Sequence, residues 1–453
     1  MTLRDLLDGL GARVIGDAGV AVRAVRSDSR EVGAGDVFVA VRGLRSDGHA
    51  FVPTAIERGA VAIVVERQVE GVTVPQAIVP NGAQALGVMV GHALGDPAKS
   101  MTLIGVTGTN GKTTTTYVVE SILGAAGHKP GVIGTVELRW AGKRVPASYT
   151  TPTPQLLHDA LAKMRDAGCT HVVMEVTSIA LAAHRAAGMQ FAVAAFSNLT
   201  QDHLDFHGAM ADYFEAKRRL FAQAAIAVVN VGDEYGAQLA AELPGVVPFR
   251  REDDLAGIDL KLRGAFNREN ALAAASAARA FGVEEDAIKR GIEAVERVPG
   301  RFEVVDEGQP FTVLVDYAHT PGALEATLEA SRELTRGRVV CVFGAGGDRD
   351  RDKRPQMGRI VAELADIGIV TSDNPRGEDP AEIAADVADG LDLSIELDRR
   401  RAIERALELA REGDLVLVAG KGHEQGQEIA GRKLPFDDRE VVRDTLRRLR
   451  APA

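Results

Sequence analysis

The sequence predicts an α/β protein of three domains in which helices cover mostly parallel sheets. Apolar runs of strand length recur along the chain, and segments with helical periodicity separate them. The length of 453 residues is enough for about three domains of ordinary size. We expect a small N-terminal α/β domain at 1–98, a central domain at 99–299 and a C-terminal Rossmann-like domain at 300–453. The central domain combines a parallel sheet with the turn GTNGKTT at 108–114, which is typical of a P-loop mononucleotide-binding domain.

The N-terminal domain is predicted from short apolar runs at 37–41, 60–65 and 76–79, which alternate with helix-like stretches. The sequence GDPAKS at 95–100 follows them. Its Gly and Pro are typical of a connection, so we predict a linker that leads into the central domain.

The stretch LIGVTGTNGKTTTT at 103–116 predicts a phosphate-binding turn between a buried strand and a helix. Backbone N–H groups at such a helix start can hold phosphates, Lys112 can reach the β- and γ-phosphates, and the Thr113 hydroxyl can bind Mg²⁺. Val106 stands where the strict P-loop pattern has a glycine, so this is a variant, and a turn that binds no nucleotide is the alternative. The predicted ATP-binding residues of the turn are Gly108, Thr109, Asn110, Gly111, Lys112, Thr113 and Thr114.

Further apolar runs at 170–176, 192–196 and 226–231 predict the rest of the central sheet. Polar residues stand at or after the ends of these runs, where parallel sheets gather ligand-binding groups. They are Glu175, Asn198 and the cluster Asp202, His203, Asp205 and His207. Taken alone, the pattern D-H-x-D-x-H also fits a zinc or iron site or a polar loop.

The C-terminal domain is predicted to begin near Pro299-Gly300-Arg301. Its strands are expected at 311–315, 339–343, 367–370 and 415–418, with helices between them, such as the one at 400–412. This second alternation of strands and helices predicts a second doubly wound sheet.

Composition and charge exclude several classes of protein. The net charge of −11 argues against a broad nucleic-acid surface. Cys169 and Cys341 stand beside or within apolar runs and are predicted to be core residues without a disulfide. The N-terminus has no signal-peptide pattern, and no apolar run is long enough to span a membrane. We therefore expect a cytoplasmic protein, which we also expect to be a monomer.

Seven motifs in one order resemble the Mur ligases of bacterial cell-wall synthesis. They are SDSREVGAGDVFVAVRG (27–43), GVTGTNGKTTT (105–115), MEVTS (174–178), SNLTQDHLDFHG (197–208), FNREN (266–270), DYAHTP (316–321) and GGDRDRDKRP (346–355). The resemblance covers nearly the whole chain and is greatest to the branch that adds the third residue of the peptide stem. It implies an ATP-dependent amide ligase that uses Mg²⁺ and adds meso-diaminopimelate to a UDP-N-acetylmuramoyl dipeptide through an acyl phosphate.

The resemblance also implies which residues bind ATP and the metal. The catalytic residues are Lys112, Glu175, His203 and Lys217, and the Mg²⁺ ligands are Thr113, Glu175, His203 and Lys217, the last as its carbamate (N6-carboxylysine). From its residue type alone, Lys217 is expected on a solvated helix face. The remaining ATP contacts are Asn267, Asn270, Arg301, Asp316 and His319. An Asp at a strand end can accept from ribose hydroxyls, and Asn267 taken alone is expected to cap a helix.

The resemblance also implies that the segment DNPRGEDP at 373–380 sets the choice of amino acid, because diaminopimelate-adding members carry DNPR and lysine-adding members do not. Diaminopimelate ends in a carboxylate, which the planar fork of Arg376 can bind, whereas lysine ends in an ammonium, which Arg376 would repel. Taken alone, D-N-P-R is also typical of a turn with a solvated arginine. By resemblance, the diaminopimelate-binding residues are Arg349, Asp373, Asn374, Pro375, Arg376, Gly420 and Glu424, and the UDP-sugar contacts are Ser29, Arg30, Thr150, Thr151, Thr177 and Arg185.

The chain departs from the family pattern at several places. Ile179 and Ala183 replace a usual His and Gln, the aromatic residue after Glu424 is absent, and the stretch from Val231 to Asn267 is some tens of residues shorter than expected. Three alternatives are kept: a lysine-adding ligase, a ligase similar to folylpolyglutamate synthetase, and a nucleotide-binding protein without ligase activity.

Overall fold

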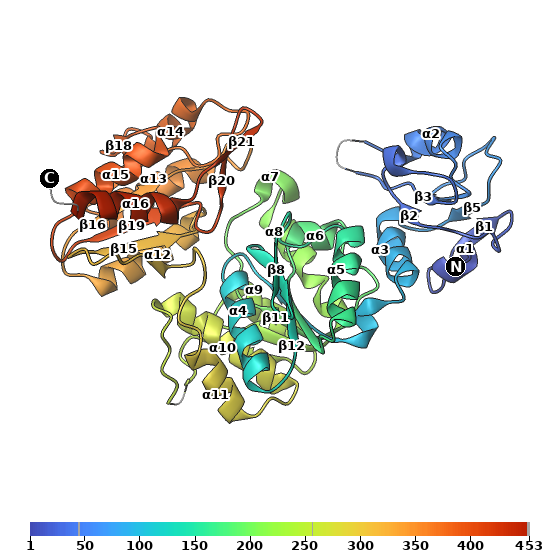
Figure 1. The fold of residues 1–453 in the computed structure, drawn as a ribbon, viewed down its shortest axis with the longest axis horizontal. Helices are drawn as coiled ribbons and strands as arrows, with labels where there is room; N and C mark the ends of the chain where they lie inside the picture. The colour runs from blue at the N-terminus through green and yellow to red at the C-terminus, as the bar shows by residue number, and fades with distance from the viewer. Residues whose placement is uncertain (44–45, 256, 451–453) are drawn as a thin grey trace. The chain divides into compact units, whose positions relative to one another are not determined.

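The computed structural model describes residues 1–43, 46–255 and 257–450, and its N-terminal part is a small α/β fold (Figure 1). Its sheet has the order β1-β5-β4-β3-β2, in which β1 is antiparallel to β5 and the other pairs are parallel. Helices α1 and α3 contribute to a core on one face, and α2 contributes to a core on the other. The elements are α1 (Leu3–Leu6), β1 (Arg13–Ile15), β2 (Val25–Arg26), η1 (Ser29–Glu31), β3 (Val37–Val39), η2 (Gly48–Phe51), α2 (Val52–Glu57), β4 (Ala62–Val65), β5 (Gln76–Ile78), α3 (Gly82–Ala93) and η3 (Pro97–Ser100).

The second sheet has eight strands in the order β13-β12-β11-β6-β10-β7-β8-β9. Strand β10 is parallel to β6 and β7, and β12 is parallel to β13, whereas β7, β8 and β9 form an antiparallel meander. The strands are β6 (Thr102–Thr107), β7 (Pro130–Ile133), β8 (Glu137–Trp140), β9 (Lys143–Pro146), β10 (His171–Glu175), β11 (Phe191–Phe196), β12 (Ala224–Asn230) and β13 (Val247–Phe249). The helices are α4 (Lys112–Ala125), α5 (Pro154–Asp166), α6 (Ser178–Ala182), α7 (Leu204–His207), α8 (Met210–Arg218), η4 (Phe221–Gln223), α9 (Glu234–Glu242), α10 (Ala265–Ala280) and α11 (Glu285–Glu293).

The third sheet has the order β14-β15-β19-β16-β17-β18 and is parallel except at β14. Its strands are β14 (Glu303–Val304), β15 (Thr312–Asp316), β16 (Val339–Phe343), β17 (Ile367–Val370), β18 (Ser394–Ile395) and β19 (Leu415–Ala419), and β20 (Gly426–Ile429) and β21 (Arg432–Pro435) form a separate hairpin. The helices are α12 (Pro321–Leu334), α13 (Lys353–Leu364), α14 (Pro380–Ala388), α15 (Arg399–Leu409) and α16 (Asp438–Arg450). The loops after the parallel strands carry most of the predicted amino-acid-binding residues.

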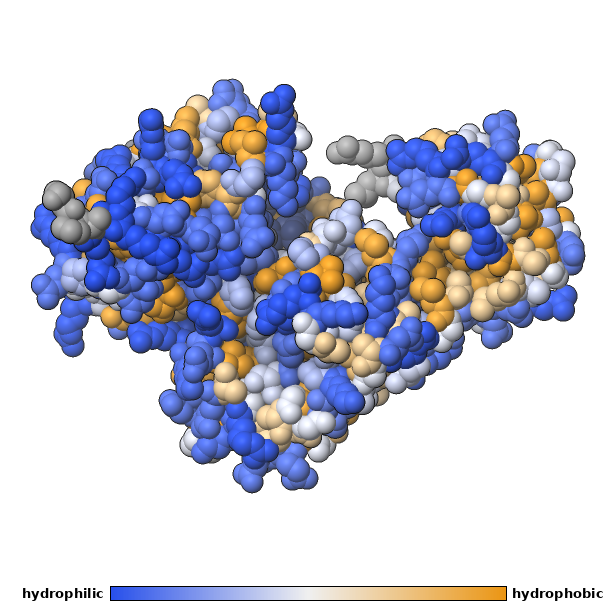
Figure 2. Space-filling model, viewed as in Figure 1, coloured by the Kyte–Doolittle hydropathy of each residue, from blue (hydrophilic) through white to orange (hydrophobic). Residues whose placement is uncertain are grey.

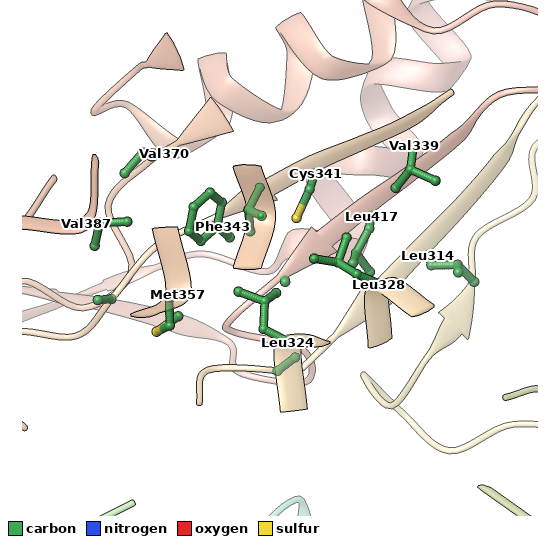
Figure 3. Close-up of a cluster of buried hydrophobic side chains, with 14 of the residues drawn as sticks. Leu314, Leu324, Leu328, Val339, Cys341, Phe343, Met357, Val370, Val387 and Leu417 are labelled. Carbon is green, nitrogen blue, oxygen red and sulfur yellow. The ribbon is translucent and has the colours of Figure 1, made fainter. Parts of the chain in front are cut away.

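Helices cover both faces of this third sheet, as the sequence predicts for a doubly wound fold. On one face, α12, α13 and α14 pack Leu324, Met357 and Val387 against Cys341 and other strand residues (Figure 3). On the other face, α15 and α16 contribute a second core. Hydrophilic side chains prevail over α15 and α16 on the face seen in Figure 2, since their apolar stripes are turned to the sheet.

The chain divides into two compact units by its internal contacts. One comprises Met1–Thr107, Gly127–Ala195 and Ala216–Ala227, and the other comprises Gly108–Ala126, Phe196–Glu215 and Val228–Ala453. The predicted fold class is confirmed, because the sheets are mainly parallel and helices alternate with their strands. The predicted domain limits at residues 98 and 299 stay a prediction.

The structure also bears on the predicted cysteine environment and on the predicted linker. Cys169 and Cys341 are free and buried, which confirms their assignment to the core. The predicted linker at 95–100 is partly ordered as η3 (Pro97–Ser100), because Pro97 at its start fixes a helical φ. Among the described residues, no helix has both the length and the hydropathy needed to cross a membrane.

Candidate active site

The predicted phosphate-binding turn joins β6 to α4, and glycines are required in it. Gly108 has a φ of +146°, and a Cβ there would lie 1.9 Å from the Ser197 Oγ. Gly111 has a φ of +88°, and a Cβ there would lie 2.1 Å from the Asn270 Oδ1. The turn therefore approaches its neighbours too closely for any side chain, as expected where backbone must approach a ligand.

The loop after β11 supports this turn through hydrogen bonds. The Thr109 N–H donates to the Asn198 carbonyl, and the Asn110 N–H donates to the Asn198 Oδ1, both at 2.9 Å. Lys112 folds back, and its Nζ donates to the carbonyls of Gly108 and Thr109 at 2.8 Å. Two N–H groups of the predicted phosphate cradle are thus used within the protein.

Helix α10 packs against α4 and places the two predicted adenine-side asparagines next to the turn. The Asn270 Nδ2 donates to the Asn267 Oδ1 at 3.1 Å, and the Asn267 Nδ2 donates to the Arg263 carbonyl at 2.7 Å. The N-cap of α10 is Gly264, so the alternative that Asn267 caps this helix is wrong. The Asn270 side chain fits into the space that Gly111 leaves.

Arg301 reaches the P-loop helix from the start of the C-terminal region. Its Nη2 donates to the Thr113 Oγ1 at 3.0 Å, and its guanidinium carbon lies 4.2 Å from the centre of the Tyr317 ring. The Asp316 carboxylate accepts from the N–H groups of Phe302, at 2.6 Å, and of Ala318, at 2.8 Å. Burial raises the pKa of Asp316, although Arg301 opposes the shift. Asp316 therefore fixes the backbone near Arg301 as well as standing at the predicted ribose position.

Asp202, which the sequence places in the D-H-x-D-x-H cluster without a role of its own, is the centre of a charged cluster. Its carboxylate lies 3.4 Å from the His203 Nε2, 4.0 Å from the His319 Nε2 and 3.7 Å from the Lys353 Nζ. Burial acts to raise the pKa of Asp202, but these three neighbours lower it well below the ordinary value. The His319 Nδ1 lies 2.8 Å from the Tyr317 carbonyl, so this nitrogen carries the proton, and burial lowers the pKa of the ring.

Glu175 ends β10, as predicted, and is 1% exposed. Its carboxylate accepts from the Thr135 N–H at 2.7 Å and from the Thr135 Oγ1 at 2.8 Å.

The Thr151 hydroxyl donates to the Glu175 carbonyl at 2.9 Å, and Arg185 donates to the Thr151 carbonyl at 2.8 Å. The Thr177 N–H donates to the Thr151 Oγ1 at 3.0 Å. Four of the predicted UDP-sugar residues, Thr150, Thr151, Thr177 and Arg185, thus connect to Glu175 directly or through one neighbour.

The other two predicted UDP-sugar residues lie in the N-terminal fold. Ser29 is buried in η1, and Arg30 is exposed and pairs with Asp28 at 2.6 Å. The departures Ile179 and Ala183 lie in and just after α6 and offer no side-chain hydrogen bond. Thr135 is a contact of Glu175 that the sequence gave no signal for, since a threonine in a turn is ordinary.

Lys217 corrects one expectation. It is 1% exposed, so the alternative of a solvated helix face is wrong. Its helix, α8, also buries Tyr213, Phe214 and Ala216, so Lys217 belongs to the packed side of the helix. A buried lysine needs a partner or a chemical change to offset the loss of hydration.

One cavity of about 160 Å³ collects most of the predicted amino-acid-binding residues. It is lined by Asp202, His203, Asp205, Tyr317, His319, Gly346, Arg349, Asp350, Lys353, Asp373, Asn374, Arg376, Gly420 and Glu424. Pro375 is buried in the same loop but does not contribute to the described lining. Residues from the ends of four parallel strands therefore meet the cluster around Asp202, as expected for a ligand site on a doubly wound sheet.

Arg376 is held in place on the wall of this cavity. Its φ is +54°, and its backbone pairs with the hairpin, where its N–H donates to the Glu428 carbonyl at 3.0 Å. Its Nη1 donates to the Gly347 carbonyl at 2.8 Å, and its Nε lies 3.5 Å from the Glu428 Oε2. Arg376 is therefore fixed by its neighbours, and the alternative of a solvated turn arginine is wrong.

The fold and the site define a nucleotide-binding enzyme of the α/β class, with a P-loop on one sheet and a charged small-molecule cavity beside the strand ends of another. Three family models match the chain: the Mur ligase family catalytic domain at residues 21–93, the Mur ligase middle domain at 106–254, and the Mur ligase glutamate ligase domain at 300–422.

Curated relatives match over almost the full length. A UDP-N-acetylmuramoyl-L-alanyl-D-glutamate–2,6-diaminopimelate ligase of Gloeobacter violaceus is 43% identical, covering 100% of this chain and 99% of the relative. A ligase of the same name from Aquifex aeolicus is 41% identical over 94% of each chain. The chain therefore belongs to the Mur ligase family, which confirms the predicted resemblance.

Solved structures agree with this assignment. A structure of a UDP-N-acetylmuramoyl-L-alanyl-D-glutamate–2,6-diaminopimelate ligase has a TM-score of 0.70 and 30% identity, and the match covers 100% of both chains. The MurF ligase of Thermotoga maritima in complex with ADP shares the fold, with a TM-score of 0.59, 22% identity, and coverage of 96% and 99%. The E. coli FolC structure in complex with ADP has a TM-score of 0.61 and 25% identity, and covers 79% of this chain and 92% of its own.

Proposed function

We propose that this protein is an ATP-dependent amide ligase that adds meso-diaminopimelate to UDP-N-acetylmuramoyl-L-alanyl-D-glutamate during peptidoglycan precursor synthesis. Full-length relatives with this name support the proposal. The observation that carries it is the cavity that brings Arg376, Asn374 and Glu424 together with His319 and His203. A cationic fork and a carboxylate on one wall suit a ligand that carries both an anionic and a cationic group.

The two charged groups at the distal end of diaminopimelate explain the choice of amino acid. Arg376 binds the distal carboxylate, and Glu424 binds the distal ammonium. Lysine has the ammonium alone, so it would leave the Arg376 guanidinium without an anionic partner. Asp373 and Asn374 are buried beside them and hold the loop in shape.

The reaction proceeds in two steps. A carboxylate oxygen of the UDP-sugar peptide attacks the γ-phosphorus of ATP, and the bond from this phosphorus to the oxygen that bridges it to the β-phosphorus breaks. ADP departs, and the peptide carries an acyl phosphate. The neutral amine of diaminopimelate then attacks the acyl carbon, phosphate departs, and the amine loses a proton. Lys112 would exchange its carbonyl contacts for phosphate oxygens and so stabilise the charge that develops there.

The residues proposed for Mg²⁺ fit it through their oxygen atoms. Thr113 offers a hydroxyl, Glu175 keeps lone pairs beyond those used by Thr135, and a carbamate on the buried Lys217 would add two more oxygens. His203 would contribute a nitrogen, which is a less usual Mg²⁺ ligand. When bound, the metal neutralises phosphate charge during transfer. In the described part of the chain, no group of three His, Cys, Asp or Glu side chains offers a ready-made metal site, so the zinc or iron alternative lacks support.

Each predicted domain would have a main substrate. Residues 1–98 would bind the UDP-sugar through Ser29 and Arg30, with Thr150, Thr151, Thr177 and Arg185 of the central domain as further contacts. Residues 99–299 would bind ATP, and residues 300–453 would bind the amino acid. The partners are small molecules alone, and the protein is proposed to be a cytoplasmic monomer.

Phosphate release with ATP, Mg²⁺, the UDP-sugar dipeptide and a panel of amino acids tests the function. We expect turnover with meso-diaminopimelate that depends on the UDP-sugar dipeptide, and a product whose mass corresponds to the tripeptide. Turnover with lysine in place of diaminopimelate would assign the lysine-adding activity. Turnover with a folate and glutamate would assign a folylpolyglutamate synthetase, and ADP binding without turnover would refute the ligase.

A further inference from the structure

Lys421 lies in a tight turn directly after β19 and is 0% exposed. The backbone around it is fixed on both sides. Arg399, which pairs with Asp438 at 2.7 Å, donates to the Ala419 carbonyl at 2.9 Å. Gly422 has a φ of +53°, and a Cβ there would lie 2.5 Å from the Gly300 carbonyl oxygen. A cation in this position must be paired, because burial removes its hydration.

The Lys421 ammonium closes a triangle of hydrogen bonds with two side chains. Its Nζ donates to the Asn374 Oδ1 at 2.9 Å and to the Glu424 Oε2 at 2.7 Å. The Asn374 Nδ2 donates to the same Glu424 oxygen at 2.9 Å. The Asn374 Oδ1 also accepts from the Glu428 N–H at 2.9 Å, so the orientation of the amide is determined by two donors. Each member of the triangle therefore fixes the other two.

Two members of the triangle line the amino-acid cavity, and Lys421 does not belong to its described lining. Lys421 therefore acts on a ligand through Asn374 and Glu424. It donates to the Glu424 Oε2, so a ligand ammonium in the cavity would pair with the other carboxylate oxygen, Oε1. Without Lys421, the Glu424 side chain could adopt more rotamers, and its negative charge would lose the neighbouring ammonium that pairs with it.

We propose that Lys421 is a positioning residue for amino-acid selection, which holds Asn374 and Glu424 in the geometry that receives the distal ammonium of the substrate. The proposal rests on the function proposed above and adds a residue that the resemblance did not assign. It predicts an effect on the amino acid alone, because the triangle contains no residue proposed to bind ATP or the UDP-sugar.

The test is steady-state kinetics of the full-length enzyme with Lys421→Met, which keeps the length of the side chain and removes the cation. We expect the KM for diaminopimelate to rise about 10- to 100-fold. We expect kcat at saturating diaminopimelate, and the KM values for ATP and the UDP-sugar dipeptide, to change less than about threefold. Lys421→Gln retains a donor and should restore part of the lost affinity.

Arg338→Met is the matched control, since Arg338 pairs with Asp414 at 2.6 Å before the other end of β19. It should lower the thermal unfolding midpoint without a selective effect on diaminopimelate. A folded Lys421→Met enzyme with an unchanged KM for diaminopimelate would overturn the inference, as would equal effects on all three substrates. Unfolding of both Lys421 variants would show a purely structural role and overturn it too. If the parent itself fails to use diaminopimelate, the proposed function is what fails.

Discussion

Replacing Arg376 by alanine should remove most of the preference for meso-diaminopimelate over lysine. The Arg376 side chain is 23% exposed, its Nη1 donates to the carbonyls of Gly347 and Asn374 at 2.8 and 3.5 Å, and its Nε faces Glu428. Because Nη1 already donates to two carbonyls, we expect a ligand carboxylate to accept from the N–H groups of Nη2, with the long Nη1 contact to Asn374 giving way. Two charge-assisted hydrogen bonds at a partly exposed site contribute about 2–3 kcal/mol, which corresponds to a preference of roughly 30- to 150-fold.

The assay compares kcat/KM for the two amino acids in the parent, in Arg376→Ala and in Arg376→Lys. Arg376→Ala should lose the preference through a higher KM for diaminopimelate, and Arg376→Lys should not restore it, because an ammonium lacks the planar fork. Arg351→Ala is the control, since Arg351 is an exposed arginine of the neighbouring loop that pairs with Glu378. Equal use of both amino acids by the parent, or full selectivity in Arg376→Lys, would refute the reasoning.

Three further predictions concern the P-loop, the buried lysine and pH. Lys112→Ala should reduce turnover about 10³-fold or more with an intact fold, and activity within about tenfold of the parent would contradict its phosphate role. Lys217→Ala should be inactive, and ¹³C-labelled bicarbonate should give the parent a carbamate signal that this variant lacks; a parent without the signal would contradict carbamylation. Burial lowers the pKa of His158 from 6.5 to about 4. As the pH falls, His158 of the unfolded chain is therefore protonated before His158 of the folded chain. The free energy of unfolding decreases as the pH drops from about 6.5 to 4, and at pH 5 it is about 2 kcal/mol lower than at neutral pH. His158→Leu should lose less than the parent in denaturation midpoint between pH 8 and pH 5, and an equal loss would contradict the assignment.

The buried strands were predictable from the sequence because they combine apolar composition with β-branched residues. The runs at 339–343 and 367–370 coincide with β16 and β17, and the run at 415–418 gives all of β19 except its last residue. Strands β9 and β21 were missed, because all their residues are exposed and carry no apolar run. Such strands are specified by their partners and turns, which a local pattern does not contain.

The candidate site was predictable where a residue type has a distinct chemical use in a fixed motif, as for Lys112 and Arg376. Residues that act through geometry left no such signal. The burial of Lys217 depends on how α8 packs, and the pairing of Lys421 with Asn374 joins residues 47 positions apart. Capping is a common role for an isolated asparagine, so the sequence alone favours it for Asn267. The helix instead starts at Ala265, after Gly264, which places Asn267 inside the helix.

The attachment of the DNPR loop to the β20–β21 hairpin has a consequence for enzyme engineering. Arg376 exchanges two backbone hydrogen bonds with the hairpin, to Glu428 and from Ala430, at 3.0 and 2.7 Å. The register of the loop is thereby set by a segment about fifty residues further along the chain. Transplanting the four residues 373–376 into a ligase of different selectivity would separate the loop from its template. A graft that also carries residues 420–435 would keep the loop attached to its hairpin and would transfer the amino-acid selectivity.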